Sequence, residues 1–435
     1  MKRALRLAVI VSAVASGLFA QSTAVKSPAD ISKAGIDPQR LARIPARMKE
    51  FVDSGTIAGG VTLVARHGVV VSLEAVGYQN LETKTPMRAD SIFQIRSMTK
   101  PITAVGIMIL LEEGRLLLSD PVEKYVPEFR DQLVVNKREG EKGITTKKPS
   151  RPITIMDLLT HTSGMPEDPP LKPHKTLAEH VALLPQEPFE FEPGTRVLYS
   201  DAGFETLGRI IEVASGQPYE KFLEERILRP LGMKDTFFFP PSEKYNRIAS
   251  AYKGQNGKLT RAEAEGPLNP DWQSQGPGGY RAFLAEVQHP GPSWGLFSTA
   301  SDMASFHQMM LNGGTYNGVR ILSRASVEAM TAVHPGGLAD DPGMGYALGW
   351  GVQRERPSSW AFALASIGAY AKNGYLGTFA WVDPQKDLIG IFMIQLNPQE
   401  PGYSVRDTFI TMTYAAIEDD LKSTTNVRKA DTHPK

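Results

Sequence analysis

The chain has 435 residues, enough for two domains of ordinary size or for one large domain with an inserted lobe. Its composition, with 41% hydrophobic and 22% charged residues, is typical of a soluble globular protein. The 48 Lys and Arg residues nearly balance the 47 Asp and Glu residues, which argues against a nucleic-acid-binding or polybasic membrane surface. Cysteine is absent, so disulfides and a lipid-modified cysteine anchor are excluded. The eight His residues are scattered, and we expect neither a metal site nor a cofactor.

The N-terminus has the pattern of an export signal. Lys2, Arg3 and Arg6 precede an apolar stretch over residues 7–20, and small residues follow it. An apolar stretch of this length is too short to span a bilayer comfortably. The pattern predicts a cleaved signal peptide over residues 1–24 and a periplasmic or secreted protein without a stable membrane anchor.

The first predicted elements are a helix and a pair of strands. Apolar residues recur every three or four positions over residues 38–55, which indicates an amphipathic helix. Residues 59–77 are rich in β-branched side chains on both sides of His67-Gly68, which predicts two strands joined by a tight turn. A third extended piece is expected at residues 91–95.

Helices are expected through the middle of the chain. Residues 98–113 form an apolar stretch that ends at Gly114, a common residue after the last turn of a helix. Residues 131–152 are polar and turn-rich, and we expect an exposed loop there. Thr154 and Asp157 have the spacing of a capping box that opens a short helix. Further helices are expected at residues 201–215, 219–228 and 300–312.

The C-terminal part resembles the N-terminal part in its elements. After residue 343 we expect three strands and a closing helix. Strands and a helix at both ends, with helices between them, predict an α/β (α+β) fold, with an antiparallel sheet flanked by helices and an inserted, mainly helical lobe. The expected domains are an α/β domain over 25–114 and 293–421, a loop-rich helical lobe over 115–292, and a mobile tail over 422–435.

Ser97 and Lys100 lie three residues apart at the start of the predicted helix 98–113. At this spacing both side chains lie on one helix face, so the Lys100 amine can reach the Ser97 hydroxyl. A serine needs a base to become a nucleophile, and a lysine can be that base if its amine is neutral near pH 7. Lowering its pKa that far costs about 4.6 kcal/mol, which desolvation and a nearby cation could supply. A second S-x-x-K match, Ser250 to Lys253, has no helix after it.

Two further segments carry residues of the same chemistry. Tyr199 and Asp201 lie where a loop meets the predicted helix 201–215, and a phenol beside an ammonium group can transfer protons. Lys372, Asn373 and Gly374 lie on a predicted strand, where a glycine lets the backbone approach a substrate closely.

These three segments resemble the S-x-x-K, Y-x-N and K-T-G motifs of the serine β-lactamase and penicillin-binding-protein superfamily, and most closely those of class C β-lactamases and family VIII carboxylesterases. The resemblance covers about residues 35–420. It implies Ser97 as the nucleophile, Lys100 as its base and Tyr199 as a proton relay. It also implies an oxyanion hole made by the backbone N–H groups of Ser97 and Tyr375, and substrate binding by Asp201, Lys372, Asn373 and Gly374.

Two residues depart from the family pattern. Asp201 stands where the family usually has asparagine, so a carboxylate replaces an amide that can donate a hydrogen bond. Asn373 replaces a threonine whose hydroxyl helps to hold a substrate carboxylate in relatives, while Lys372 keeps the positive charge. Both departures favour simple ester cleavage over β-lactam cleavage.

A rival nucleophile is Ser293, in a G-x-S-x-G match over residues 291–295. That motif requires a strand before it and a helix directly after it, and two prolines stand in the preceding segment. We therefore interpret the segment as a turn that lines the cleft. His161 is expected to fix a loop rather than to act as a base.

The sequence therefore predicts an exported serine hydrolase that forms an acyl-enzyme on Ser97 and hydrolyses carboxylic esters of modest size. Its partner is a small-molecule ester or amide. One alternative is a β-lactamase, a D,D-peptidase or a D-aminopeptidase. An alternative of another class is a penicillin-binding protein or pseudoenzyme without turnover, which the intact set of Ser97, Lys100 and Tyr199 disfavours.

Overall fold

The computed structural model describes residues 28–140, 143–166, 176–255, 258–262, 289–334, 343–355, 363–397 and 400–418. The predicted signal peptide over residues 1–24 and the predicted tail over residues 422–435 lie outside the described residues. Within the described ranges, no helix combines the length and the apolar character that a membrane crossing requires.

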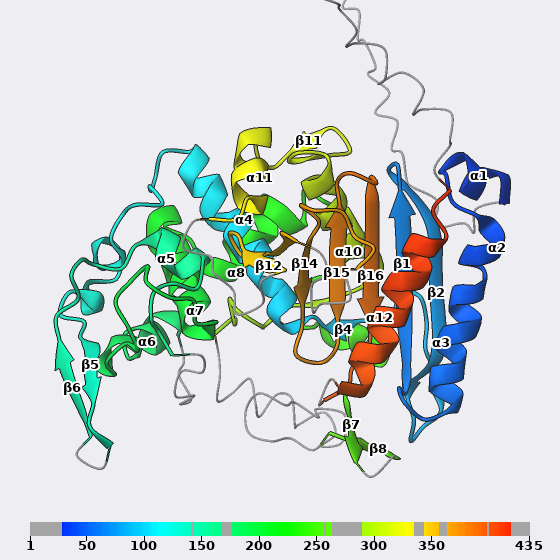
Figure 1. Ribbon diagram of the computed structural model, residues 1–435, viewed down its shortest axis with the longest axis horizontal. Coiled ribbons are helices and arrows are strands. Elements are labelled where there is room, and N and C mark those ends of the chain that lie inside the picture. The colour runs from blue at the N-terminus through cyan, green and yellow to red at the C-terminus, as the bar shows by residue number, and fades with distance from the viewer. Residues whose placement is uncertain are drawn as a thin grey trace, which may run out of the picture.

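An eight-stranded antiparallel sheet forms the centre of the molecule (Figure 1). Its strand order is β12-β13-β14-β15-β16-β1-β2-β3, so strands from both ends of the chain pair along β1 and β16. The fold predicted from the sequence, an antiparallel sheet flanked by helices, is confirmed. The strands are β1 (Gly59–Arg66), β2 (Val69–Asn80), β3 (Thr85–Pro86), β12 (Met344–Tyr346), β13 (Gly351–Gln353), β14 (Tyr370–Asn373), β15 (Phe379–Asp383) and β16 (Leu388–Met393).

Helices cover both faces of this sheet. The terminal helices pack on one face, and α10 (Ala300–Leu311) packs on the other. The apolar strand β16 shows how both faces are filled: Leu388 and Phe392 join the core under the terminal helices, whereas Ile389 and Ile391 join the core under α10. Alternate side chains of a strand point to opposite faces, so a nearly continuous apolar run suits a strand buried on both sides. The terminal helices are α1 (Pro28–Lys33), α2 (Pro38–Leu41), α3 (Arg43–Asp53) and α12 (Glu400–Ala415).

The long helix α4 (Thr99–Glu112) lies between the sheet and a lobe of shorter elements, which is on the left of Figure 1. It contacts α7 (Asp201–Ser215) and α8 (Tyr219–Leu223) of that lobe, and twelve of its residues are buried. The capping box predicted at Thr154 and Asp157 is present. The remaining helices are α5 (Ile155–Leu159), α6 (Leu177–Val181) and α11 (Arg324–Thr331).

The turn between β1 and β2 has the predicted chemistry. His67 and Gly68 both have positive φ angles, 51° and 72°. Two consecutive residues in this region form the tight turn that matches the twist of a hairpin. The predicted pair of strands is confirmed.

Two predictions of local structure are wrong. Residues 131–152 are not a plain loop, because β5 (Val134–Arg138) and β6 (Ile144–Lys147) pair as an exposed hairpin. Within the described residues, the three strands expected after residue 343 are five, because two of the expected segments each contain a turn. Small two-stranded pairs complete the fold: β4 (Phe93–Gln94) with β9 (Phe297–Ser298), β7 (Tyr252–Gln255) with β8 (Lys258–Arg261), and β10 (Thr315–Tyr316) with β11 (Val319–Arg320).

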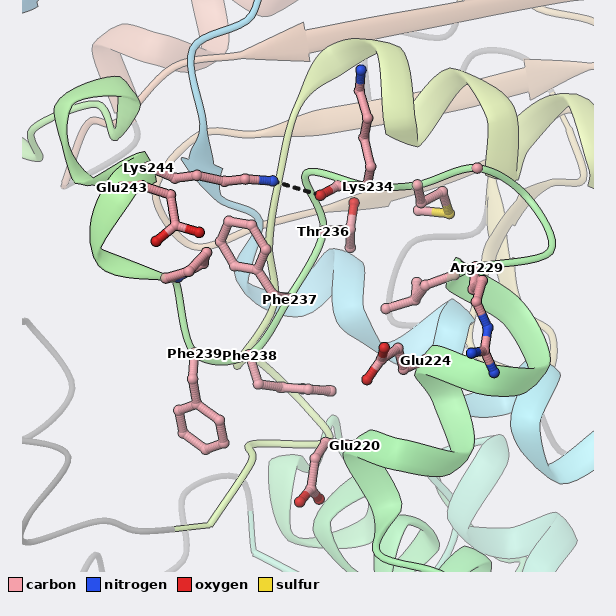
Figure 2. A pocket seen from close by; sticks show the side chains of 14 residues that line it. Glu220, Glu224, Arg229, Lys234, Thr236, Phe237, Phe238, Phe239, Glu243 and Lys244 are labelled. Atoms are coloured by element: carbon pink, nitrogen blue, oxygen red, sulfur yellow. Dashed lines mark hydrogen bonds between the residues drawn. The ribbon is translucent and has the colours of Figure 1, made fainter.

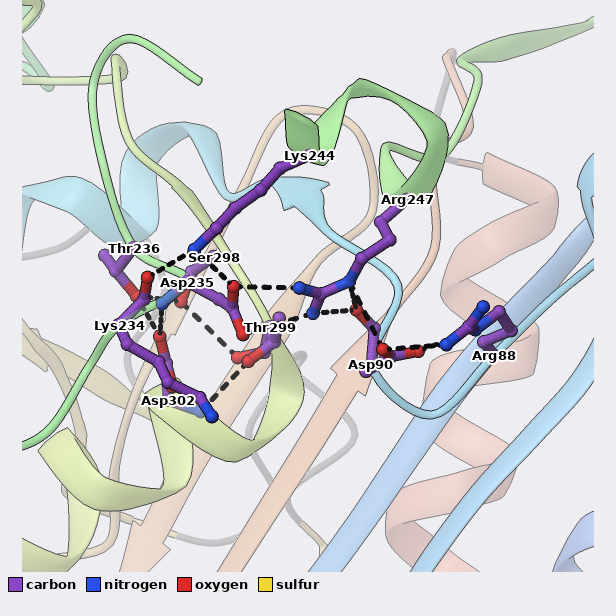
Figure 3. A network of polar contacts seen from close by, with 10 residues as sticks. All are labelled: Arg88, Asp90, Lys234, Asp235, Thr236, Lys244, Arg247, Ser298, Thr299 and Asp302. Carbon is purple, nitrogen blue, oxygen red and sulfur yellow. Dashed lines mark hydrogen bonds and ion pairs between the residues drawn. The ribbon is translucent and has the colours of Figure 1, made fainter. Parts of the chain in front are cut away.

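A buried polar network ties the segment after α8 to the start of α10 (Figure 3). Asp302 accepts two hydrogen bonds on one carboxylate oxygen, from the Asp235 backbone N–H at 2.7 Å and from the Thr236 hydroxyl at 2.9 Å. The Asp235 carboxylate in turn binds Lys244 at 2.7 Å and Arg247 at 2.9 Å. Burial raises the pKa of Asp302 to about 6, and the nearby Asp235 carboxylate adds to the effect.

This shift predicts a pH-dependent contribution to stability. The pKa of an unfolded aspartate is about 3.9, so between about pH 4 and pH 6 the folded state holds a proton that the unfolded state has lost. The free energy of unfolding contributed by Asp302 therefore falls as pH rises through this window. Asp302→Asn keeps an oxygen for both hydrogen bonds but has no charge. Relative to the wild type, the variant should gain about 1–3 kcal/mol of stability between pH 4 and pH 7. Urea unfolding at several pH values measures this difference, and a difference that does not change with pH would contradict the prediction.

Candidate active site

Ser97 lies at the N-terminus of the helix that the sequence predicted. A short 3-10 turn over Arg96–Met98 leads from β4 directly into α4. Ser97 is therefore at the positive end of the helix dipole, and its side chain is only partly buried. Arg96, the preceding residue, has a φ angle of 50°, in the left-handed region that residues with a side chain rarely adopt. Such strained backbone often occurs at functional sites.

Lys100 is completely buried one helical turn after Ser97. Its Nζ atom donates hydrogen bonds to Ser97 Oγ at 3.2 Å, to the Ser293 carbonyl oxygen at 3.1 Å and to the Asp201 carboxylate. An ammonium group has three N–H donors, and each of them has an acceptor here. The structure therefore places Lys100 against Ser97 and holds it in its charged form.

The charge of Lys100 differs from the sequence-based expectation. Burial by itself would lower the pKa of Lys100, but the Asp201 carboxylate and the Tyr199 phenol outweigh burial and raise this pKa above its ordinary value. The expected neutral amine is therefore wrong. Desolvation and a nearby cation would favour the neutral amine, whereas the structure places an anion in contact with Lys100.

Tyr199 lies between two ammonium groups. The centre of its ring is 4.7 Å from Lys100 Nζ and 4.5 Å from Lys372 Nζ. Burial opposes ionisation of the phenol, but the two lysines outweigh burial and lower the pKa of Tyr199. Tyr199 is thus the group at this site whose ionisation the surrounding charges favour.

His161 supports the segment that carries Tyr199. Its Nδ1 atom accepts a hydrogen bond from the Ser200 backbone N–H at 3.1 Å, and its ring is 4.6 Å from the ring of Tyr199. Burial, together with Lys372 and Lys100, holds the pKa of His161 well below its usual range, so the ring is neutral. The sequence-based interpretation of His161 as a loop-fixing residue is confirmed by this contact.

The end of β14 lies beside the segment that leads into Ser97. A Cβ atom on Gly374 would lie 2.3 Å from the Ile95 carbonyl oxygen, so only glycine fits at this contact. The same carbonyl accepts a hydrogen bond from the Thr378 hydroxyl at 3.1 Å. The contact brings together the two segments that carry the amides of Ser97 and Tyr375. Asn373 directly precedes Gly374, and the Tyr375 side chain is 58% exposed.

Lys372 is buried near the end of the same strand, with 4% of its surface exposed. Burial and the charge of Lys100 lower its pKa, while Tyr199 acts in the opposite direction. All eight residues predicted for the site are described, and the contacts above link Ser97, Lys100, Tyr199, Asp201 and Lys372.

Ser293, the rival nucleophile, is completely buried. Its hydroxyl donates a hydrogen bond to Glu205 at 2.6 Å, and no helix follows its turn directly. Ser250, in the second S-x-x-K match, is also buried, and Lys253 lies on the two-stranded hairpin of β7 and β8. Neither serine is placed as a nucleophile.

Glu205 and Arg96 were not predicted as site residues from the sequence. Glu205 follows Asp201 by four residues on α7, so both acids lie on one helix face, and this spacing was the signal that could have revealed it. Arg96 is buried, and its guanidinium carbon is 5.9 Å from the centre of the Trp294 ring. Nothing in the sequence indicates this contact, because the two residues are far apart along the chain.

A separate hollow of about 590 Å³ lies beside α8 (Figure 2). Phenylalanine side chains contribute to its walls, and both acidic and basic side chains surround them, including Glu220, Glu224, Arg229 and Lys244. Its lining includes none of the residues predicted for the active site. In the part of the chain that the structure describes, no group of three His, Asp or Glu side chains is arranged to hold a metal ion.

Known proteins resemble this chain over most of its length. Protein Rv1367c of Mycobacterium tuberculosis (strain ATCC 25618 / H37Rv) is 31% identical over 377 residues, which cover 81% of this chain and 89% of that protein. The N-acetylmuramyl-L-alanine amidase of Bacillus subtilis (strain 168) is 26% identical over 404 residues, which cover 87% of this chain and 88% of that protein.

A solved structure has the same fold. It is that of EstCE1, a hydrolase with promiscuous acyltransferase activity. It superposes with a TM-score of 0.70 at 24% identity and covers 88% of this chain and 99% of EstCE1. The Beta-lactamase family model matches residues 44–414. This chain belongs to the Beta-lactamase family and has the fold of the serine β-lactamase and penicillin-binding-protein superfamily.

Proposed function

We propose that this protein is an exported serine hydrolase that cleaves carboxylic esters of modest size through an acyl-enzyme on Ser97. The observation that carries the proposal is the contact of Ser97 Oγ with a fully buried ammonium group, Lys100, whose Nζ also lies 4.7 Å from the centre of the Tyr199 ring. Export rests on the basic and apolar pattern of residues 1–24.

In the proposed mechanism, Tyr199 is the base and Lys100 is a permanent cation. Because two ammonium groups favour the phenolate, Tyr199 takes the Ser97 proton, while the Lys100 ammonium donates a hydrogen bond to Ser97 Oγ. Ser97 Oγ then attacks the ester carbonyl carbon, and the backbone N–H groups of Ser97 and Tyr375 stabilise the oxyanion. The bond to the leaving alcohol breaks, and Tyr199 returns the proton to the alcohol oxygen.

The second half of the reaction uses the same groups. Water attacks the acyl carbon of the Ser97 ester while Tyr199 takes one proton from it. The bond between the acyl carbon and Ser97 Oγ then breaks, and the proton passes to Ser97. The carboxylic acid leaves and the starting state is restored.

Asp201 supports esters as the substrate class. Its carboxylate accepts from Lys100, and in this ionised form it has no proton to donate. An amide substrate that needs a donated hydrogen bond at this position meets an acceptor instead, at a cost of about 1 kcal/mol or more. EstCE1, a hydrolase with promiscuous acyltransferase activity, has this fold, which agrees with acyl transfer as the proposed chemistry.

Amide hydrolysis is the second candidate. It covers β-lactams and D-amino-acid peptides, and the name of the Bacillus subtilis relative, an amidase, favours it. Acylation without turnover, as in a penicillin-binding protein, is the remaining alternative, and it would appear as a stoichiometric burst of product.

The proposed nucleophile can be tested with a short-chain p-nitrophenyl ester. Ser97→Ala removes the attacking oxygen and should lower kcat by at least about 10³-fold. Ser293→Ala is the matched comparison, because it keeps the carbonyl group that binds Lys100 and should retain activity within about tenfold. Ester hydrolysis that survives the Ser97 substitution would remove Ser97 as the nucleophile.

The role of Asp201 can be tested by Asp201→Asn, which restores the amide usual in the family. The amide can donate to a substrate carbonyl, and it no longer holds Lys100 as a cation so strongly. The ratio of kcat/KM for a chromogenic cephalosporin to kcat/KM for the ester should rise by about tenfold, as expected for one hydrogen bond. Steady-state kinetics on both substrates measures this ratio, and a ratio that stays the same or falls would contradict the assigned role.

A further inference from the structure

A turn over residues 291–295 is fixed between α4 and α7. The Pro292 carbonyl oxygen accepts a hydrogen bond from the Thr103 hydroxyl at 2.7 Å, and Thr103 lies one helical turn after Lys100. On the other side, Gly208 of α7 leaves no room for a side chain, because a Cβ there would lie 2.2 Å from the Pro292 ring. The turn is therefore held closely by both helices.

Glu205 binds the next residue of this turn at two points. Its Oε1 atom accepts from the Ser293 backbone N–H at 3.2 Å and from the Ser293 hydroxyl at 2.6 Å. The Glu205 side chain is nearly completely buried on α7. The Ser293 carbonyl oxygen accepts from Lys100 Nζ at 3.1 Å. The Glu205 carboxyl group thus fixes Ser293, and the Ser293 carbonyl group in turn fixes Lys100.

We propose that Glu205 is a positioning residue that acts through Ser293 to hold Lys100 against Ser97, and that it does so in its neutral, protonated form. This inference rests on the proposed function, because it assigns a task within the same site. Among the described residues, the hydrogen bonds of Glu205 go to Ser293 and none goes to Ser97.

The surroundings of Glu205 favour the neutral form. Its second oxygen, Oε2, is buried and has no hydrogen-bond partner among the described residues, so an ionised carboxylate would lack a donor there. The charged and titratable groups around it are Asp201 on α7, Lys100 on α4 and Tyr219 on α8. Burial, with a smaller contribution from Asp201, raises the pKa of Glu205 to about 8, although the Ser293 hydrogen bonds and Lys100 oppose the rise.

Ionisation of Glu205 should reduce activity. A second carboxylate near Lys100 would compensate part of the positive charge that favours the Tyr199 phenolate. The base would then hold its proton more strongly, and attack by Ser97 would slow. We therefore expect kcat/KM to fall above about pH 8 in the wild type, the pH at which Glu205 loses its proton.

The experiment compares Glu205→Gln and Glu205→Leu with the wild type. Glutamine keeps an oxygen for both Ser293 hydrogen bonds and cannot ionise. Its kcat at pH 7 should stay within about threefold of the wild type, and the fall in kcat/KM above pH 8 should disappear. Leucine removes both hydrogen bonds and should lower kcat by about tenfold or more, with KM within about threefold.

Glu220→Gln is the matched control. Glu220 is a partly buried glutamate whose pKa is also raised, by burial and by Glu212, and it lies in the separate hollow of Figure 2. Its pH profile should match that of the wild type. The inference would be overturned if the fall in kcat/KM above pH 8 persists in Glu205→Gln, or if it disappears in Glu220→Gln. A Glu205→Leu protein with wild-type kcat would do the same.

A fluorophosphonate probe separates this inference from the proposed function. The probe reacts with an activated serine whatever the natural substrate, and intact mass spectrometry measures its attachment. If Ser97 is labelled in the wild type, and the pH dependence of labelling is the same in the wild type and in Glu205→Gln, only the role of Glu205 is overturned. Absence of labelling in the wild type would overturn both proposals. Labelling whose fall above pH 8 is lost in Glu205→Gln supports both.

Discussion

The active-site region depends on one buried cation, the ammonium group of Lys100. Burying a charge costs several kcal/mol unless it is paired and its hydrogen bonds are made. Its three acceptors come from different parts of the chain: the start of α4, the start of α7 and the turn at residues 291–295. These segments must therefore pack together before Lys100 can be buried, and the same packing places Ser97, Tyr199 and Lys372 beside one another.

The local parts of this arrangement could be predicted from the sequence, because their causes lie within a few residues. The capping box at Thr154, the turn at His67-Gly68 and the helix after Ser97 each follow from nearby side chains. The hairpin at residues 134–147 could not be predicted in this way. After the valines that begin β5, its strands are mostly polar and exposed, so they lack the apolar alternation that identifies a strand.

The charge of Lys100 could not be predicted for a related reason. The S-x-x-K spacing establishes that Lys100 reaches Ser97, but the protonation state depends on Asp201, which is 101 residues further along the chain. A neutral amine was expected at Lys100 because desolvation and a nearby cation favour that form. Asp201 was identified from the sequence as a departure from the family's asparagine, but not as the group that decides the charge of Lys100. The carboxylate at this position changes which form of the lysine is stable. A single departure from the motif thus moves the proposed task of the base from Lys100 to Tyr199.

The balance of charges around Tyr199 explains why these residues act together. Lys100 and Lys372 carry positive charge, whereas Asp201 is the anion that pairs with Lys100. With more positive than negative charge nearby, ionisation of the Tyr199 phenol reduces the imbalance, and its pKa falls despite burial. A neutral Glu205 preserves this excess of positive charge. An ionised Glu205 would add a second negative charge beside Asp201, and ionisation of the Tyr199 phenol would then be less favoured. Tyr199, the proposed base, therefore depends on two features: the lysines that it contacts, and the Glu205 carboxyl group of α7, which stays protonated and therefore neutral.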